Sequence, residues 1–144
     1  MVHDRPQSKP SPLELERIAK EWMDRIWLKH DLEAIDELHA LGFIDRSSAG
    51  RDTNNEAYKS GIVELYQAFP DFHAQTDDLV SDLISGKIAI RWSATGTHSA
   101  DFFGVPATGK RIKFTGIEIL RIENDRIVER WGEWDGMGIL EQLK

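Results

Sequence analysis

Residues 85–143 read SGKIAIRWSATGTHSADFFGVPATGKRIKFTGIEILRIENDRIVERWGEWDGMGILEQL. Apolar and polar residues alternate in three segments of this stretch, from Ile88 to Thr97, from Ile112 to Ile122 and from Ile127 to about Trp134. Alternation with a period of two predicts strands, and the Asn-Asp pair at 124–125 predicts a hairpin between the last two. The stretch therefore predicts an antiparallel meander, followed by a short helix that ends the chain.

Glu118 interrupts the apolar face of the second segment. It shares the parity of Phe114, Leu120 and Ile122, so a regular strand directs its carboxylate toward the core. A buried carboxylate costs free energy unless it is paired, hydrogen-bonded, protonated or lining a cavity. Glu118 is therefore a pocket residue, a satisfied structural carboxylate, or the sign of a bulge that shifts the parity of the strand.

Three helices are predicted upstream of these strands. Residues 11–29 begin with a serine cap and a proline and continue with an apolar stripe at helical spacing. Residues 31–42 form a second, short helix that ends at a glycine, and residues 54–70 a third that ends at a proline. Residues 73–81 alternate weakly and predict a first strand. The order predicts an α+β fold, with the helices packed on a curved antiparallel sheet of about four strands around a conical cavity.

Composition limits the class of function. The 144 residues suit one domain over residues 11–144, preceded by a polar, mobile tail over residues 1–10. The net charge of −7 argues against a nucleic-acid partner, and no apolar run is long enough to cross a membrane. The chain has no cysteine, and no two histidines share metal-ligand spacing, so we expect no metal site. These features predict a soluble, cytoplasmic protein.

Several residues are candidates to line the cavity, each with a structural alternative. The aromatic candidates could equally be core residues: Trp22, Trp27, Tyr66, Trp92 and Trp134. His98, at the end of the first long strand, is either an acid–base group or a hydrogen-bonded structural histidine. Asp45 either projects into the cavity or makes a local turn, and Asp135 is more simply explained as the cap of the last helix.

The opposite face of the second long strand also carries apolar residues, Ile117 and Ile119, among polar ones. A sheet that is apolar on both faces needs a cover for its outer face, and a second copy of the chain is the simplest cover. The pattern therefore predicts a homodimer formed through the outer face of the sheet.

Four strings of the sequence resemble the SnoaL-like polyketide cyclase family, part of the NTF2-like superfamily. They are GTH at 96–98, GVPATGK at 104–110, EILRIENDRIVERW at 118–131 and DGMGILEQL at 135–143. The similarity is strong over residues 86–143 and weaker but collinear upstream. It implies an NTF2-like cone, usually a dimer, with a deep apolar pocket and no cofactor.

The resemblance also implies where catalytic residues would lie. In the family's cyclases an aspartate on the last strand acts as general acid and base, accompanied by a histidine on the preceding strand. These two places fall here on Gly132 and Glu118, and the place of an asparagine near the second helix falls on Asp45. Because Gly132 stands in the place of the aspartate, we do not infer the cyclase activity of the family for this protein. Glu118 and Asp45 remain as two candidate catalytic carboxylates.

Three functions remain open at this point. The first is a protein that binds a small, largely apolar molecule and performs cofactor-free proton transfer through Glu118 and Asp45, by analogy of fold with related isomerases and epoxide hydrolases. The second is a binding module without catalysis, which the replacement of the aspartate by Gly132 favours. The third is a purely structural dimerisation domain, in which the tryptophans fill the cavity.

Overall fold

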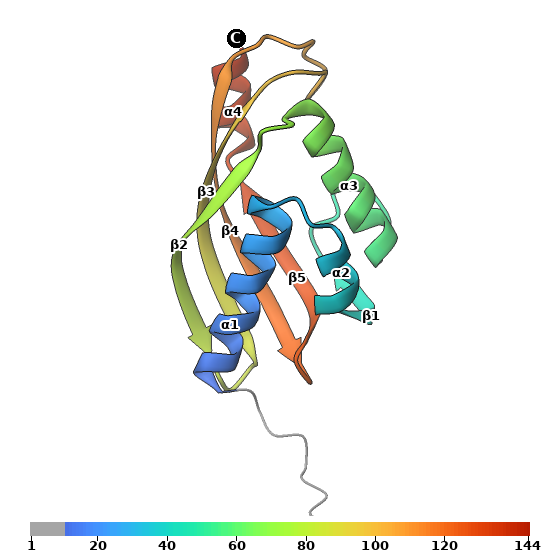
Figure 1. Ribbon diagram of the computed structural model, residues 1–144, viewed down its shortest axis with the longest axis vertical. Coiled ribbons are helices and arrows are strands. Elements are labelled where there is room, and N and C mark those ends of the chain that lie inside the picture. Colours follow the sequence, from blue (N-terminus) through green and yellow to red (C-terminus); the bar gives the residue numbers. More distant parts are fainter. Residues whose placement is uncertain (1–10) are drawn as a thin grey trace, which may run out of the picture.

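The computed structural model describes residues 11–144, so the predicted tail over residues 1–10 lies outside the described residues. Five strands form one curved sheet in the order β1-β5-β4-β3-β2 (Figure 1). The strands are β1 (His39–Asp45), β2 (His73–Asp82), β3 (Lys87–Thr97), β4 (Arg111–Glu123) and β5 (Arg126–Trp134). The helices are α1 (Pro12–Trp22), η1 (Met23–Leu28), α2 (Glu33–Leu38), α3 (Asn55–Ala68) and α4 (Gly136–Leu143). The predicted α+β fold is confirmed.

Local capping explains where three of the helices begin. The side chains of Ser11, Asn54 and Asp135 each accept a hydrogen bond from a backbone N–H in the first turn of α1, α3 and α4, respectively. The helices α1, α2 and α3 lie on one face of the sheet, and α4 packs along β4 (Figure 1). The short helix α2 differs from the prediction, because it begins after Leu32 without a side-chain cap and ends at Leu38.

The first helix keeps its predicted length but changes its geometry. It is α-helical as far as Trp22 and continues from Met23 to Leu28 as a π-helix. The backbone N–H of Lys29 accordingly donates to the carbonyl oxygen of Asp24, five residues earlier. Such wide turns are rare and often occur at functional sites. In this chain the π-helix carries Trp27, which points into the cavity described below.

A fifth strand corrects the predicted topology. Residues 39–45 were expected to end the second helix and continue as an apolar anchor and polar turn, but they form β1, which pairs in parallel with β5. The register joins His39 to Ile127 and Asp45 to Arg130, with an irregularity between them. Leu41 is fully exposed, so β1 does not show the alternation of a half-buried strand. Because β1 pairs in parallel with a strand some 85 residues away, no tight turn joins the two strands, and the sequence next to β1 shows no hairpin signal.

A bulge in β5 decides which of its side chains face the helices. Arg121 pairs with Glu129 and the next residue, Ile122, pairs with Ile127, so Val128 is an extra residue without a partner. Simple alternation from Ile127 would place Glu129 on the inner face. The bulge shifts the parity by one residue, so that Arg130 faces inward instead.

A buried histidine connects the helices to β1. His39 is nearly inaccessible, and its Nε2 atom accepts a hydrogen bond of 3.0 Å from the indole N–H of Trp22. Its Nδ1 atom lies 2.9 Å from Oδ1 of Asn55 and donates to it, since the amide oxygen can only accept. The contact with Trp22 requires the neutral ring, because only an unprotonated Nε2 accepts a hydrogen bond. Burial lowers the pKa of His39 from 6.5 to about 4, and the hydrogen bond to Asn55 offsets this only in part.

The stability of the protein is therefore expected to depend on His39 in mildly acidic solution. Because the pKa of His39 is lower in the folded chain, the unfolded chain binds more protons between pH 6.5 and about 4, and stability falls as pH falls through this interval. The expected loss near pH 5, relative to neutral pH, is about 2 kcal/mol from this residue. Urea unfolding of the wild type and of His39→Gln at both pH values measures it. Parallel pH profiles for the two proteins would contradict the expectation.

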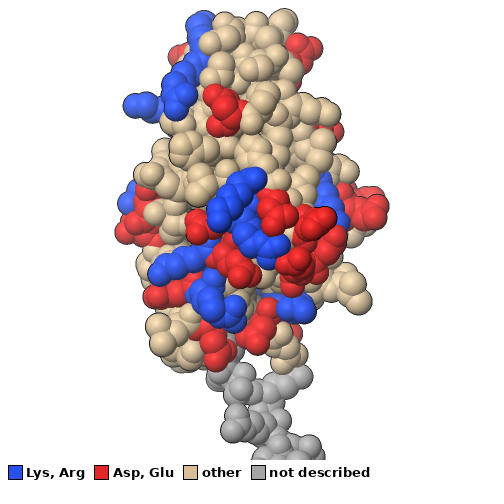
Figure 2. All heavy atoms as spheres, viewed as in Figure 1, with Lys and Arg blue, Asp and Glu red and all other residues tan. Residues whose placement is uncertain are grey.

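The outer surface of the helical layer is charged. In Figure 2, Lys, Arg, Asp and Glu side chains gather over α1 and α2, whereas the upper centre of this face carries few charged side chains. Acidic and basic side chains alternate there in pairs such as Arg25 with Asp31 and Lys59 with Asp36. Among residues 11–144, no helix is long and apolar enough to cross a membrane.

Candidate active site

Arg130 joins the two carboxylates that the sequence singled out. Its Nε atom lies 2.7 Å from Oε1 of Glu118, and its Nη1 atom lies 3.0 Å from Oδ1 of Asp45. Glu118 and Asp45 are only 4% and 2% exposed, so both ion pairs are shielded from water. Although burial opposes its charge, the neighbouring carboxylates raise the pKa of Arg130 above its usual range. The three groups form a buried cluster with a net charge of −1.

The two carboxylates have different surroundings. Asp45 ends β1, and its Oδ1 atom also accepts a hydrogen bond of 3.0 Å from the backbone N–H of Ser47. Glu118 lies in the middle of β4, and its Oε2 atom accepts a hydrogen bond of 3.3 Å from the indole N–H of Trp92. Burial raises the pKa of Glu118, because the loss of hydration outweighs the attraction of Arg130. Glu118 is therefore a stronger base than an exposed glutamate.

Gly132 makes room for this arrangement. It is the direct cross-strand partner of Glu118, with both residues on the inner face of the sheet. A Cβ atom at Gly132 would lie less than 3.0 Å from both Nη2 of Arg130 and Oε2 of Glu118. The backbone N–H of Gly132 donates to the hydroxyl of Ser47 at 2.9 Å, which fixes the loop after β1 against β5. A side chain at this position would require the ends of the Arg130 and Glu118 side chains to shift.

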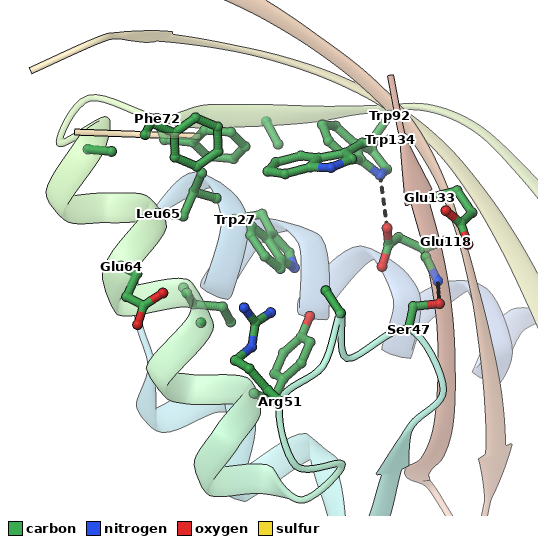
Figure 3. A pocket seen from close by; sticks show the side chains of 18 of the residues that line it. Trp27, Ser47, Arg51, Glu64, Leu65, Phe72, Trp92, Glu118, Glu133 and Trp134 are labelled. Carbon is green, nitrogen blue, oxygen red and sulfur yellow. Dashed lines mark hydrogen bonds between the residues drawn. The ribbon is translucent and has the colours of Figure 1, made fainter. Parts of the chain in front are cut away.

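An aromatic cavity of about 860 Å³ opens above Glu118, between the sheet, η1 and α3. Figure 3 shows Trp27 projecting into it from the helical side, while Trp92 and Trp134 lie across it above Glu118. Gly116 allows this arrangement, because a Cβ atom there would lie less than 3.0 Å from the Trp92 indole. Aromatic and apolar side chains make up most of the wall: Trp22, Met23, Trp27, Tyr58, Ile62, Leu65, Phe72, Trp92, Phe102, Phe103 and Trp134.

The structure places most of the predicted pocket residues around this cavity. Six of the nine line it: Glu118, Trp22, Trp27, Trp92, Gly132 and Trp134. Asp45 does not line it and contacts it through Arg130. Tyr66 is also outside the lining, and its hydroxyl donates to the backbone carbonyl of Ile26 while its ring supports Trp27.

His98 lies at the far end of β3, outside the residues that line the cavity. Its ring is fully buried against Phe69, and its Nδ1 atom accepts a hydrogen bond of 3.1 Å from the backbone N–H of Thr108. This contact ties the loop between β3 and β4 back to the strand. The geometry is that of the structural alternative considered for this residue.

Two further acidic residues, Glu133 and Asp135, lie close in sequence to Gly132, the place of the missing strand aspartate. Glu133 is exposed and is one of the residues that line the cavity (Figure 3), but its partner across the strand pair is Ile117 and not Glu118. Asp135 accepts a hydrogen bond of 2.9 Å from the backbone N–H of Gly138, as the cap of α4. Within residues 11–144, no group of three or more histidine or acidic side chains is placed to hold a metal ion.

Sequence reasoning missed two residues of the site. Arg130 was not among the predicted residues, although it shares the parity of Gly132 and Trp134; the bulge at Val128 gives it the opposite parity to Ile127. Tyr58 fits the apolar stripe of α3, so its spacing gave no reason to separate it from the core. Tyr58 nevertheless lines the cavity, although the residue as a whole is only 4% exposed.

The sequence and the fold are similar to those of known proteins. The sequence profile of the SnoaL-like polyketide cyclases matches residues 17–143. The structure of TsrD from Streptomyces laurentii is similar with a TM-score of 0.82 at 20% identity, over 93% of this chain and 97% of that one. IdmH from Streptomyces antibioticus is similar with a TM-score of 0.78 at 28% identity, over 90% and 97% of the two chains.

A SnoaL-like polyketide cyclase from Agrobacterium tumefaciens strain C58 is similar with a TM-score of 0.75 at 22% identity, over 90% of this chain and 98% of that one. TsrD and the Agrobacterium protein are less than 25% identical in sequence to this chain, so their similarity concerns the fold alone. No protein of curated function matches the sequence. The predicted NTF2-like fold and the predicted family are both confirmed by these similarities.

Proposed function

This chain belongs to the SnoaL-like polyketide cyclase family, and we propose that it binds a small, largely apolar molecule of polyketide or steroid size and performs cofactor-free proton transfer on it. The observation that carries this proposal is Glu118, a buried carboxylate that lies beneath an aromatic cavity of about 860 Å³. Cavities of this size and character are typical ligand sites.

We assign the role of general base to Glu118. Its carboxylate faces the cavity, and burial raises its pKa above the usual 4.5, which brings its basicity closer to neutral pH. Arg130 and the Trp92 N–H keep the carboxylate in place. Asp45 acts as a positioning residue, because it contacts the cavity only through Arg130, whose guanidinium it holds from the other side.

Replacement of Glu118 with glutamine is expected to remove this activity. Apolar ketones serve as probes, and proton abstraction is followed by the uptake of solvent deuterium at the carbon next to the carbonyl. The variant should exchange at least about 100-fold more slowly, since general-base catalysis contributes about 10²–10⁴-fold. The wild-type rate should rise with pH through a pKa above 4.5, because only the ionised carboxylate accepts a proton.

Glu133→Gln is the matched control, because Glu133 is a second carboxylate of the cavity lining that is exposed and has no contact with Arg130. It should exchange at the wild-type rate. Thermal unfolding of both variants separates loss of chemistry from loss of fold, since Glu118→Gln also removes one charge from the Arg130 cluster. An unchanged exchange rate in a folded Glu118→Gln protein would exclude Glu118 as the base.

A binding module without catalysis is the second candidate. Two observations favour it: Gly132 stands where the family's cyclases have their aspartate, and both oxygens of Glu118 already accept hydrogen bonds. It predicts that apolar ketones bind to the wild type without deuterium uptake, and that Glu118→Gln binds them equally well. Uptake catalysed by the wild type would rule out this candidate.

We also propose that the protein is a homodimer through the outer face of the sheet. The cross-strand row Val80, Ala89, Ile119 and Trp131 is apolar on this face, and Val80, Ile117 and Ile119 are exposed. Burial of this row against a second copy would remove it from water.

Ile119→Lys is accordingly expected to give a monomer in sedimentation equilibrium, because a charge in the centre of the interface would lose its hydration. Val63→Lys, an exposed apolar position on α3, is the control and should leave the dimer intact. A monomeric wild type would contradict the proposal.

A further inference from the structure

Two hydrogen-bond donors border the cavity without an acceptor. The indole Nε1 atom of Trp27 and the hydroxyl of Tyr58 are buried, and no protein atom among residues 11–144 accepts from either. Both residues line the cavity. An indole N–H can only donate, and burial raises the pKa of Tyr58 well above its usual 10, so the hydroxyl keeps its proton.

The neighbouring residues show that this is not a general feature of the wall. The indole N–H of Trp22 donates to His39, and that of Trp92 donates to Glu118. The hydroxyl of Tyr66, outside the cavity, donates to a backbone carbonyl. Buried donors normally have partners, because an unsatisfied buried donor loses its bond to water without replacement. Within residues 11–144 three buried side-chain atoms lack a partner: Nε1 of Trp27, the hydroxyl of Tyr58 and Nε2 of His98. Of these, only Trp27 and Tyr58 line the cavity.

The two donors lie on adjoining rings. The rings of Trp27 and Tyr58 pack edge to face with their centroids 6.3 Å apart, one from η1 and the other from α3. The guanidinium of Arg130 lies over the Tyr58 ring, with its Cζ atom 5.4 Å from the ring centroid. This part of the wall therefore offers two N–H or O–H groups near a fixed positive charge, and it borders the same cavity as Glu118.

We propose that Trp27 and Tyr58 together receive a carbonyl oxygen of the ligand. The inference rests on the proposed function and deepens it. When Glu118 removes the proton from the carbon next to this carbonyl, the C–H bond breaks and its electron pair forms a carbon–carbon double bond. The carbonyl π electrons move to the oxygen, and the two donors stabilise the resulting enolate until the proton returns.

A pair of probes with the same shape tests this assignment. 2-Acetylnaphthalene carries a carbonyl where 2-ethylnaphthalene carries a methylene group, and the quenching of tryptophan fluorescence measures the binding of each. The wild type is expected to bind the ketone about tenfold more tightly, since each accepted hydrogen bond adds a modest net gain. Tyr58→Phe should lower this preference to about threefold, since Trp27 still donates, and should keep the wild-type affinity for 2-ethylnaphthalene. Trp27→Phe should reduce the preference for the ketone in the same direction.

Tyr66→Phe is the matched control, because it removes a tyrosine hydroxyl that already has an acceptor and lies outside the cavity. It should keep the preference for the ketone. Thermal unfolding adds a second readout: without ligand, Tyr58→Phe should unfold at the wild-type temperature or above it, because it removes a donor that has no protein partner.

Equal affinity of the wild type for the two probes would overturn the inference, as would a ketone preference in Tyr58→Phe that is as large as in the wild type. If neither probe binds the wild type, the proposed apolar ligand site fails and this inference fails with it. If the ketone preference holds but Glu118→Gln exchanges deuterium normally, the general-base role is wrong while the carbonyl site stands.

Discussion

Arg130→Met is expected to lower the free energy of unfolding by about 3–5 kcal/mol, because it leaves Glu118 and Asp45 buried without their common partner. Methionine keeps the unbranched apolar stem of arginine and removes the guanidinium, so the effect reports mainly on the loss of the charged group. Urea unfolding at neutral pH measures it. Arg126→Met is the control, since Arg126 is exposed at the start of β5, and its stability should stay within about 0.5 kcal/mol of the wild type.

The defect of Arg130→Met should also depend on pH. Burial already raises the pKa of Glu118, and removal of the guanidinium raises it further. A carboxyl group with a raised pKa in the folded state destabilises the protein as pH rises through that pKa. The difference in stability between variant and wild type should therefore be smallest in mildly acidic solution and grow toward neutral pH.

A second comparison checks the origin of this effect. Adding Glu118→Gln and Asp45→Asn to Arg130→Met removes the uncompensated charges and should recover part of the lost stability. A triple variant that is no more stable than Arg130→Met would show that packing or hydrogen bonding of the arginine, and not charge, explains the loss.

Gly132→Asp is expected to lower the free energy of unfolding by about 3 kcal/mol or more, and not to restore cyclase chemistry. The new Cβ atom would overlap Nη2 of Arg130 and Oε2 of Glu118, and overpacking of this kind costs about 1–3 kcal/mol. The new carboxylate would in addition face Glu118 directly across the strand pair, where two like charges repel each other. Chemical unfolding measures the combined loss.

Two variants separate the steric from the electrostatic part. Gly132→Ala carries only the overlap and should lose about 1–3 kcal/mol, whereas Gly42→Ala should be nearly neutral because nothing lies within 4 Å of its Cβ position. Glu118→Ala combined with Gly132→Asp moves the carboxylate across the strand pair, where Arg130 can still pair with it. This double variant should be more stable than Gly132→Asp alone. If Gly132→Asp proves as stable as the wild type, Gly132 is not what keeps Glu118 and Arg130 in place.

These expectations begin with Glu118, whose buried position the sequence predicted. Glu118 shares the parity of the apolar residues of β4, and the strand is regular from Arg111 to Arg121, so alternation alone placed its carboxylate inside. The caps of α1, α3 and α4 and the hairpin at Asn124 were equally predictable. Each depends on contacts within a few residues of the chain, and so on side chains that the sequence shows next to one another.

Only the tertiary structure decided which side chains contact Glu118. Strand β1 forms against β5 through pairing across 85 positions, and this brings Asp45 beside Arg130. The bulge at Val128 turns Arg130 inward, and a one-residue shift of this kind leaves no mark on the pattern of apolar residues. The sequence therefore determined that a carboxylate lies in the core. Its partners depend on strand register over long distances, which follows from the packing of the whole sheet and not from any local run of residues.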